Sequence, residues 1–479
     1  MGEVVFPEWR FCQVFGDNTP LEDVQEEDVI TQIKFSRDGD YLAAGDIGGR
    51  IVVFQRSHRD REREREKQTK SKKRVTAEYS FHTEFQSHEP QFDSLRSIEI
   101  DQRINDIAWL KPRSMGQYML TANDKTVKLW RCHTQVERSV INLNFPAGNP
   151  PTASIKEVKT PRVVPGEAHV VPRLCTAFRN ASTYHINGVN PLYDQENFIV
   201  SDDLCVNLWS YEDPTRAFNV VDLKPDVIDE LTEVISCSTT HPTMGSMFAY
   251  GTSKTNIAIC DMRDSALVDR PSSILCANPG SCTSPNLSDG APGSPKARGK
   301  GKQNNGPTLP ITSISYSKDG TRLVARDFMS VYVWDPRNTA RPESVIPVLP
   351  TFEPHLQRLS SIGVTFDPFA VALSHDARFV LTGAYGNKFR LYDINGMNGL
   401  AIAASRSVRR SKHGHKGANA KTTPCASLGA QACRWDGAPT SFADAQDLER
   451  KIMHFDMHPT ENVMAVATRN NLFLYASKN

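Results

Sequence analysis

Short apolar runs of similar length recur seven times along the chain, each closing on an aromatic residue or a cysteine. They are rich in β-branched and aromatic residues, which suit a half-buried, pleated strand. The seven runs are Ile51-Val52-Val53-Phe54, Val127-Lys128-Leu129-Trp130, Val206-Asn207-Leu208-Trp209, Ile257-Ala258-Ile259-Cys260, Val331-Tyr332-Val333-Trp334, Phe389-Arg390-Leu391-Tyr392 and Leu472-Phe473-Leu474-Tyr475. A four-stranded unit repeated around a ring is the sequence signature of a β-propeller. We therefore predict an all-β, seven-bladed β-propeller.

The residues before each run follow a common order of strand, tight turn and strand. In the first repeat an apolar stretch at 30–35 precedes the turn Ser36-Arg37-Asp38-Gly39 and a second stretch at 41–44. This order is typical of a meander of antiparallel strands. It recurs from residue 104, 186, 234, 311, 369 and 452. We predict one domain over 9–479, with blade endings near 54, 130, 209, 260, 334, 392 and 475.

A further apolar segment, Phe11-Cys12-Gln13-Val14-Phe15, precedes the first repeat. We expect it to pair with the final blade, because joining the two ends of the chain in one sheet removes open strand edges.

Four insertions interrupt the repeats. Residues 57–74 carry alternating and basic charges and read as a solvated tract. Residues 131–182 contain extended segments and prolines, for which we predict a protruding β-hairpin arm. Residues 271–307 are rich in Pro, Gly, Ser and Asn, which predicts disorder. Residues 395–446 read as a basic loop.

The net charge of +1 provides no global field that would attract nucleic acid or a membrane surface. The longest apolar runs fall far short of a membrane helix, and the acidic N-terminal segment lacks the core of a signal peptide. The ten cysteines are scattered, so we expect reduced thiols. These features favour the cytoplasm, with the nucleus as a second compartment, and neither a nucleic-acid nor a membrane partner.

No catalytic, cofactor-binding or metal-binding motif emerges, so we expect no catalytic residue, cofactor or metal site. Asp124, Asp202, Asp203 and Asp327 each stand six or seven positions before the end of a recurring run. Carboxylates at such positions usually accept backbone hydrogen bonds within a turn.

One segment outside the repeats combines aromatic and polar residues: Phe85-Gln86-Ser87-His88-Glu89-Pro90. Two interpretations remain open. It is either an ordered loop between blades or a partner contact, since interfaces use aromatic anchors with a polar rim.

Several of these motifs, in order, resemble the fifty-five-kilodalton WD-repeat regulatory B subunits of protein phosphatase type 2A. The resemblance rests chiefly on segments outside the generic strand endings: Gly45-Asp46-Ile47-Gly48-Gly49-Arg50, Phe85-Gln86-Ser87-His88-Glu89-Pro90, Tyr184-His185-Ile186-Asn187, Phe218-Asn219-Val220-Val221-Asp222, Asp229-Glu230-Leu231-Thr232-Glu233-Val234-Ile235 and Ala465-Val466-Ala467-Thr468-Arg469-Asn470-Asn471-Leu472. It spans about residues 11–475.

The resemblance implies a subunit that is not itself an enzyme. It would dock on a HEAT-repeat scaffold subunit, together with the phosphatase catalytic subunit, and hold phosphoprotein substrates near the active site. The arm and the segment Phe85, Gln86, Ser87, His88, Glu89 and Pro90 would face the scaffold. The substrate groove would use Tyr184, His185, Asp202, Asp203, Leu204, Leu231, Val234, Asp327 and Phe366.

The chain departs from the family pattern around Ser360-Ser361-Ile362-Gly363-Val364-Thr365, where acidic residues are usual. Pro368 and Ile47 stand where lysine is usual. We therefore expect weaker selection for basic peptides than is typical of the family. The generic propeller leaves a different adaptor, such as a ubiquitin-ligase substrate receptor, as the alternative function.

Overall fold

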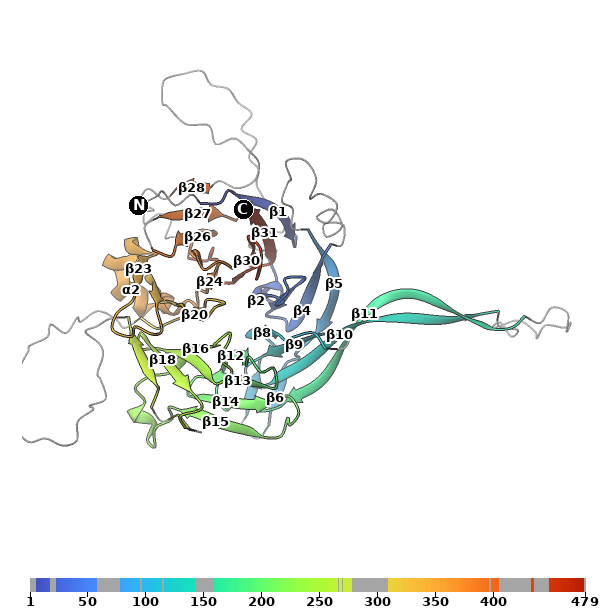
Figure 1. Cartoon of the computed structure of the whole chain (residues 1–479), viewed down its shortest axis with the longest axis horizontal. Coiled ribbons are helices and arrows are strands. Elements are labelled where there is room, and N and C mark those ends of the chain that lie inside the picture. The colour runs from blue at the N-terminus through green and yellow to red at the C-terminus, as the bar shows by residue number, and fades with distance from the viewer. Residues whose placement is uncertain are drawn as a thin grey trace, which may run out of the picture.

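The computed structural model is a ring of seven antiparallel sheets around a central axis (Figure 1). It describes residues 6–17, 23–57, 78–94, 97–113, 116–142, 159–265, 267–268, 270–277, 309–395, 398–404, 432–434 and 448–477. Each sheet is a meander whose innermost strand lines the axis. The fold is therefore a seven-bladed β-propeller, as the recurring runs predict.

Within each blade the strands follow one another from the axis to the rim. Blade 1 comprises β2 (Ile30–Phe35), β3 (Tyr41–Asp46), β4 (Arg50–Arg56) and β5 (Tyr79–Gln86). Blade 2 comprises β8 (Asp106–Trp109), β9 (Gly116–Ala122), β10 (Val127–Ile141) and β11 (Arg162–Phe178). Blade 3 comprises β12 (Ile186–Pro191), β13 (Asn197–Asp202), β14 (Cys205–Ser210) and β15 (Ala217–Asp222). Blade 4 comprises β16 (Ile235–Thr240), β17 (Met247–Thr252), β18 (Asn256–Asp261) and β19 (Ser273–Cys276).

The remaining three blades complete the ring. Blade 5 comprises β20 (Ser313–Tyr316), β21 (Leu323–Arg326), β22 (Ser330–Trp334) and β23 (Ser344–Pro347). Blade 6 comprises β24 (Val371–Leu373), β25 (Phe379–Gly383), β26 (Lys388–Asp393), β27 (Gly399–Ala403) and β28 (Ala432–Arg434). Blade 7 comprises β29 (Phe455–Met457), β30 (Val463–Thr468), β31 (Asn471–Ser477) and β1 (Trp9–Phe15).

The recurring apolar runs form the third strand of each blade, and a rim strand follows them. Two expected insertions therefore begin inside a blade. β19 occupies the start of 271–307, and β27 occupies the start of 395–446. A rim strand packs only one of its faces, so its composition is less apolar than that of an inner strand. Residues 58–77, 278–308, 405–431 and 435–447, which hold most of three expected insertions, lie outside the described residues.

The last two strands of blade 2 continue beyond the sheet as a hairpin arm. β10 and β11 pair from Val127 with Phe178 out to Ile141 with Arg162. Figure 1 shows this arm projecting from the rim of the ring. The predicted protruding β-hairpin is therefore present.

The N-terminal strand closes the ring. β1 pairs antiparallel with β31, from Trp9 opposite Ser477 to Phe15 opposite Leu472. Phe11 lies with its ring centroid 6.0 Å from that of Tyr475 and 6.3 Å from that of Phe473. The prediction from the apolar segment 11–15 is confirmed.

Buried apolar side chains collect between neighbouring blades. Among the described residues they form seven clusters, one for each pair of adjacent blades. Every blade therefore depends on both neighbours for its core, which makes the ring a single packed unit.

A second set of contacts joins the inner strands around the axis. In blades 1 to 5, a polar side chain at the start of the inner strand donates to a backbone carbonyl of the next blade. These donors are Thr31 to Ile104 at 2.6 Å, Asn105 to Ile186 at 3.2 Å, Asn187 to Ile235 at 2.9 Å, Ser236 to Ile311, and Thr312 to Phe369 at 2.9 Å. Ala370 and Met453 follow the corresponding residues of blades 6 and 7 and have no such donor.

Short helical segments occupy loops between blades. They are η2 (Glu26–Asp28), η4 (Ile228–Glu230), η5 (Pro350–His355), α2 (Leu356–Ser361) and η6 (Val364–Phe366). No helix in the described part of the chain is both long and apolar enough to cross a bilayer.

The described cysteines are not all reduced. Six are free thiols: Cys12, Cys132, Cys175, Cys205, Cys237 and Cys260. Cys276 is disulfide-bonded, so the expectation of reduced cysteines is wrong at that residue.

Candidate functional site

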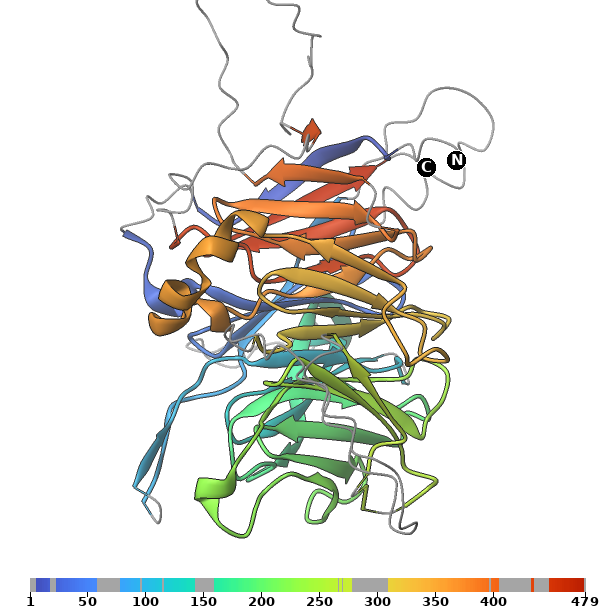
Figure 2. The ribbon, with the colours of Figure 1, turned by 90° about the vertical axis from the view of Figure 1, so that its left-hand side faces the viewer.

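The inner strands of all seven blades start on the same face of the ring, which we call the top face. Because each blade is a meander, the turn between its second and third strands returns to this face. The top face therefore carries inter-blade loops such as 179–185, 223–234 and 350–368, and turns such as 123–126 and 202–204. It lies at the left of Figure 2, where the orange helix α2 and a light-blue hairpin project.

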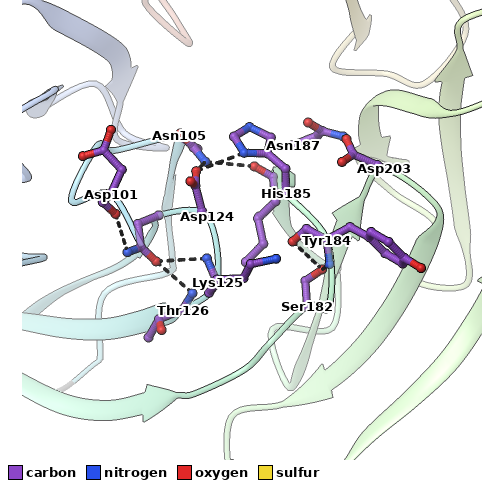
Figure 3. Close-up of polar contacts among 12 residues, drawn as sticks. Asp101, Asn105, Asp124, Lys125, Thr126, Ser182, Tyr184, His185, Asn187 and Asp203 are labelled. Atoms are coloured by element: carbon purple, nitrogen blue, oxygen red, sulfur yellow. Dashed lines mark hydrogen bonds and ion pairs between the residues drawn. The ribbon is translucent and has the colours of Figure 1, made fainter. Parts of the chain in front are cut away.

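Asp124 and His185 form the centre of a polar cluster on the top face (Figure 3). Asp124 lies in the second turn of blade 2, and His185 ends the loop that leads into blade 3. His185 Nδ1 lies 3.0 Å from Asp124 Oδ1, and Asn105 Nδ2 donates to the same oxygen at 2.8 Å. His185 is 49 % exposed. Its imidazole thus bonds a neighbouring loop and still faces solvent.

The Asp124–His185 contact shifts the pKa of both side chains. The hydrogen bond to Asp124 raises the pKa of His185, although burial opposes this shift. Burial alone would raise the pKa of Asp124, but the hydrogen bonds from His185 and Asn105 outweigh it and lower that pKa. The contact therefore shifts the pair toward the imidazolium–carboxylate form.

Blade 3 repeats the arrangement of blade 2 with a second carboxylate. Asn187 Nδ2 donates to Asp203 Oδ1 at 3.1 Å, as Asn105 does to Asp124. The carbonyl of Asp203 accepts the N–H of Ile235 at 2.8 Å, which ties this turn to blade 4. Tyr184 is half-buried, and its N–H donates to Ser182 Oγ at 3.1 Å.

An apolar and acidic segment lies beside this cluster, in the loop between blades 3 and 4. Leu231 is 38 % exposed and Val227 is exposed, while Val234 is half-buried. The neighbouring Glu230 is an exposed acidic residue. Five of the nine residues expected in the groove thus lie in successive loops and turns on the top face of blades 2 to 4: Tyr184, His185, Asp203, Leu231 and Val234.

Three of the expected groove residues are inside the blades. Asp202 is 1 % exposed and accepts the N–H groups of Leu204 and Cys205, at 2.8 and 2.6 Å. Leu204 is 4 % exposed. Asp327 is 2 % exposed and accepts the N–H groups of Met329 and Ser330. Both carboxylates therefore have the turn-stabilising role predicted for aspartates at these positions, and they have no surface left for a ligand.

Phe366 occupies a different part of the top face. It ends η6, in the helical insertion between blades 5 and 6, and is 60 % exposed. Ile362, at the end of α2, is also exposed. No acidic residue occurs between Pro354 and Phe366, although exposed Glu353 and half-buried Asp367 flank this segment, and its exposed apolar side chains are Ile362 and Phe366.

The segment 85–90 is mainly an internal anchor. Phe85 packs against Trp130 with ring centroids 4.5 Å apart, and buried Ser87 Oγ bonds Thr121 Oγ1 at 2.8 Å. His88 is buried, and its Nε2 lies 3.2 Å from the carbonyl of Thr126. Burial lowers the pKa of His88 to about 3, with nearby Lys128 adding to the effect.

The remaining residues of this segment, Gln86, Glu89 and Pro90, are exposed, while Phe85 is half-buried. The small hairpin of β6 (Gln91–Asp93) and β7 (Ile98–Ile100) follows directly, with Phe92 and Ile98 exposed. Residues 85–88 are therefore part of an ordered connection between blades. The exposed aromatic surface lies in the hairpin that these residues anchor.

Asn105 is a site residue that no sequence motif singled out, and Asn187 stands only as the last residue of the motif Tyr184-His185-Ile186-Asn187, with no role assigned to it. Each directly follows the isoleucine that begins an inner strand, at Ile104 and Ile186. Comparing this position between repeats would have identified them, because each asparagine bonds the aspartate of its own blade and a carbonyl of the next.

The described residues contain no group of three or more His, Cys, Asp or Glu side chains arranged to hold a metal ion. What the top face offers is a set of carboxylates beside exposed apolar side chains, which suits binding of a basic and apolar segment. A ring of blades with such a face defines a class of protein: a seven-bladed β-propeller without a described metal centre and with an acidic and apolar top face.

Comparisons with known proteins narrow this class. The regulatory subunit sur-6 of serine/threonine-protein phosphatase 2A from Caenorhabditis elegans is 35 % identical, with 98 % of this chain and 90 % of that protein covered. The beta isoform of the 55 kDa regulatory B subunit from Arabidopsis thaliana is 33 % identical, covering 98 % and 96 %. The regulatory B subunit of phosphatase PP2A from Schizosaccharomyces pombe is 32 % identical, covering 98 % of each.

The chain therefore belongs to the family of 55 kDa regulatory B subunits of protein phosphatase 2A. A scan against protein-family models finds no match. Among solved structures, the β-propeller domain of Cps50 (Swd1) from Myceliophteria thermophila is similar with a TM-score of 0.47 and 11 % identity, covering 94 % of this chain and 97 % of that one.

Proposed function

We propose that this protein is the substrate-recruiting subunit of a protein phosphatase 2A heterotrimer. It binds a HEAT-repeat scaffold subunit that also carries the catalytic subunit, and it presents phosphoproteins to that catalytic subunit. It contributes no catalytic residue and no cofactor, and it acts in the cytoplasm. The observation that carries the proposal is the likeness to regulatory B subunits over 98 % of the chain.

The hairpin arm supports a role in scaffold binding. Val136, Val140 and Val163 are exposed along the paired strands β10 and β11. An extended, two-stranded arm with exposed apolar side chains gives a partner a long contact surface at a distance from the ring. Such a contact would leave the top face open.

The top face supports a role in substrate binding. Asp124 and Asp203 supply negative charge, and Leu231 supplies exposed apolar surface in the next loop. Charge steers the approach of a basic segment, and apolar contact then holds it. Holding the substrate on the same assembly as the active site raises its effective concentration there, because the encounter becomes intramolecular.

Reconstitution tests the assembly. The purified chain is mixed with a scaffold subunit and a phosphatase 2A catalytic subunit, and the mixture is separated by size-exclusion chromatography. Co-elution of all three in one complex is the expected result. A folded chain that retains neither subunit would falsify the proposal and would favour another class of propeller adaptor.

Substrate presentation has its own test in the assembled trimer. Asp203→Asn and Leu231→Ala are expected to raise the KM for a basic phosphopeptide, with kcat little changed, because both residues lie away from the chemistry. Asp213→Asn is the matched control, since Asp213 is an exposed turn residue outside the top face. An equal effect of all three variants would argue against substrate binding at the top face.

The sector around α2 bears on specificity. Because Ile362 and Phe366 expose apolar surface, we expect the affinity for a peptide to depend only weakly on Lys or Arg residues of the peptide that contact this sector. Peptide arrays with graded Lys and Arg content measure this dependence, and a steep dependence across the whole peptide would contradict the prediction.

A further inference from the structure

The inner strands enclose a polar cavity of about 480 Å³ along the axis of the ring. Its walls come from all seven blades and are lined mainly by polar side chains. Its mouth on the top face is bordered by Asn105, His185 and Asn187, the residues of Figure 3. A cavity of this volume is within the range that holds small molecules.

Two carboxylates in this cavity already have hydrogen-bond donors. Asp106 accepts the N–H groups of Ile107 and Val189, at 2.9 and 2.8 Å, and the amide of Gln32 at 3.0 Å. Asp456 accepts the N–H groups of Phe35 and Met457, at 2.7 and 2.9 Å. Both groups link neighbouring blades, so their oxygens are largely used by the fold.

Lys34 acts on both carboxyls through charge alone: burial raises the pKa of Asp106 and Asp456, and the lysine opposes that rise. Lys34 and Arg103 line the cavity, and neither makes an ion pair within 4.0 Å or a side-chain hydrogen bond with another described residue. His454 also lines it, and its buried Nε2 has no hydrogen-bond partner among the described residues. Lys34 and Arg103 are half-buried, so their donors are accessible to water or a ligand in the cavity, while the buried His454 Nε2 is a polar atom for which a partner is expected.

The arrangement restricts the chemistry of a ligand. Lys34 and Arg103 offer donors to an oxyanion, while Asn105, Asn187 and Asn190 line the cavity with amide oxygens that can accept from hydroxyl groups. The two carboxylates and two cations sum to zero charge, so the wall does not compensate a highly charged guest. A singly charged oxyanion fits both features of the wall: it accepts hydrogen bonds from Lys34 and Arg103, and it carries less charge than a multiply charged ligand that the wall would not compensate.

We propose that the axial cavity binds a small, singly charged oxyanion bearing hydroxyl groups, of the size of a sugar acid. The carboxylate of the ligand accepts hydrogen bonds from Lys34 and Arg103, and its hydroxyl groups bond the asparagine side chains. A ligand in this position contacts several blades at once and stabilises the ring only when it is closed.

Gluconate is the probe, and glucose is its uncharged counterpart of nearly the same size. Isothermal titration calorimetry on the full chain at constant ionic strength is expected to detect gluconate and not glucose. Arg103→Gln and Lys34→Gln should each weaken gluconate binding at least about tenfold, the loss expected for one charge-assisted hydrogen bond. Arg337→Gln, at an exposed turn of blade 5, should leave it unchanged.

A second measurement keeps the test independent of folding defects in the variants. A crystal structure of the wild-type chain grown with gluconate should show the ligand between Lys34 and Arg103. Equal binding of glucose, undiminished binding in Arg103→Gln, or a cavity filled with water alone would overturn the proposal.

Discussion

Gly39 and Gly320 each lie against a histidine of the preceding blade. Gly39 has φ +79° in the first turn of blade 1, and a Cβ there would lie 1.8 Å from His458 Nε2. Gly320 has φ +72° in blade 5, and its Cβ would lie 2.3 Å from the ring of His241. In both histidines Nδ1 accepts backbone N–H groups of its own turn. The near-identical turns in the sequence thus mark the same contact between blades.

Gly39→Ala should destabilise the protein by well over the roughly 1–2 kcal/mol that a left-handed backbone alone costs an alanine. The excess comes from displacement of His458. Gly386→Ala is the matched control, because Gly386 has φ +73° with nothing within 4 Å of an added Cβ. Urea denaturation of both variants measures the difference, and equal losses would show that the histidine contact is unimportant.

The buried His88 makes stability depend on pH. Its folded pKa of about 3 lies below the ordinary value of 6.5. Above pH 6.5 the imidazole is neutral in both states, and the pH has no effect through this group. As the pH falls below 6.5, the unfolded chain binds a proton that the folded chain excludes, so the free energy of unfolding decreases by up to about 1.4 kcal/mol per pH unit.

His88→Gln should reduce that slope between pH 6.5 and 5 relative to the wild type. Denaturation at a series of pH values measures the slope, and His169→Gln, on the exposed arm, serves as the comparison. An unchanged slope in His88→Gln would mean that this imidazole is accessible to protons in the folded state.

His185 should make peptide binding depend on pH above 6.5, whereas the effect of His88 on stability occurs below pH 6.5. Its pKa is raised by Asp124, so deprotonation occurs above pH 6.5. Loss of the imidazolium charge leaves Asp124 uncompensated, and a Lys-rich peptide should then bind more tightly. Fluorescence anisotropy from pH 6 to 9 should show this increase in the wild type and not in His185→Gln. A pH-independent affinity in the wild type would contradict it.

At the scale of elements, the arm is a continuous hairpin, since β10 and β11 are paired from Val127 with Phe178 to Ile141 with Arg162. Val140 and Val163 are cross-strand partners near its far end, and both are exposed. Val140→Asp or Val163→Asp should weaken scaffold binding by about 1–2 kcal/mol or more, as for a central interface residue. The thermal midpoint should hardly change, because these side chains are on the surface.

Val345→Asp is the control for the arm, since Val345 is exposed on the rim strand β23 of blade 5. Surface plasmon resonance against the scaffold subunit compares the three variants. An effect of Val345→Asp equal to the others would place the interface outside the arm.

The sequence predicts the inner elements well and the rim poorly. Inner strands bury both faces, so runs such as Val331-Tyr332-Val333-Trp334 are continuously apolar. The rim strand β19 buries one residue of four and follows closely on Pro271, so its sequence resembles a loop. The helical insertion is not predicted, although Phe352, Leu356 and Leu359 have the spacing of a helix face packed on the core.

The candidate site is predictable only in part, because the direction in which its side chains point depends on packing between blades. Tyr184 and His185 are identified by motif, and Asp203 by its spacing from the end of a recurring run and by the family resemblance. Whether a turn carboxylate faces inward, as in Asp202, or outward, as in Asp203, depends on packing between blades. A single repeat contains no information about that packing.

At the scale of the whole molecule, the ring depends on β1. Trp9 is buried in the cluster between blades 6 and 7, so Trp9→Ala should cost about 3–5 kcal/mol. Phe81→Ala, on the exposed face of rim strand β5, should cost little. Urea denaturation compares the two, and limited proteolysis should cleave the N-terminal segment faster only in Trp9→Ala. Equal stability of the variants would mean that closure by β1 is dispensable.

Blade 7 combines β1, which begins at Trp9, with β29 to β31, which end at Ser477. During synthesis on the ribosome β1 emerges first and has no partner until nearly all other strands have been made. Its apolar side chains are meanwhile available to wrong partners, including nascent copies of the same chain. The last β-strand to be translated is therefore the one that commits the polypeptide to its final shape, and folding helpers would be most needed just before it appears.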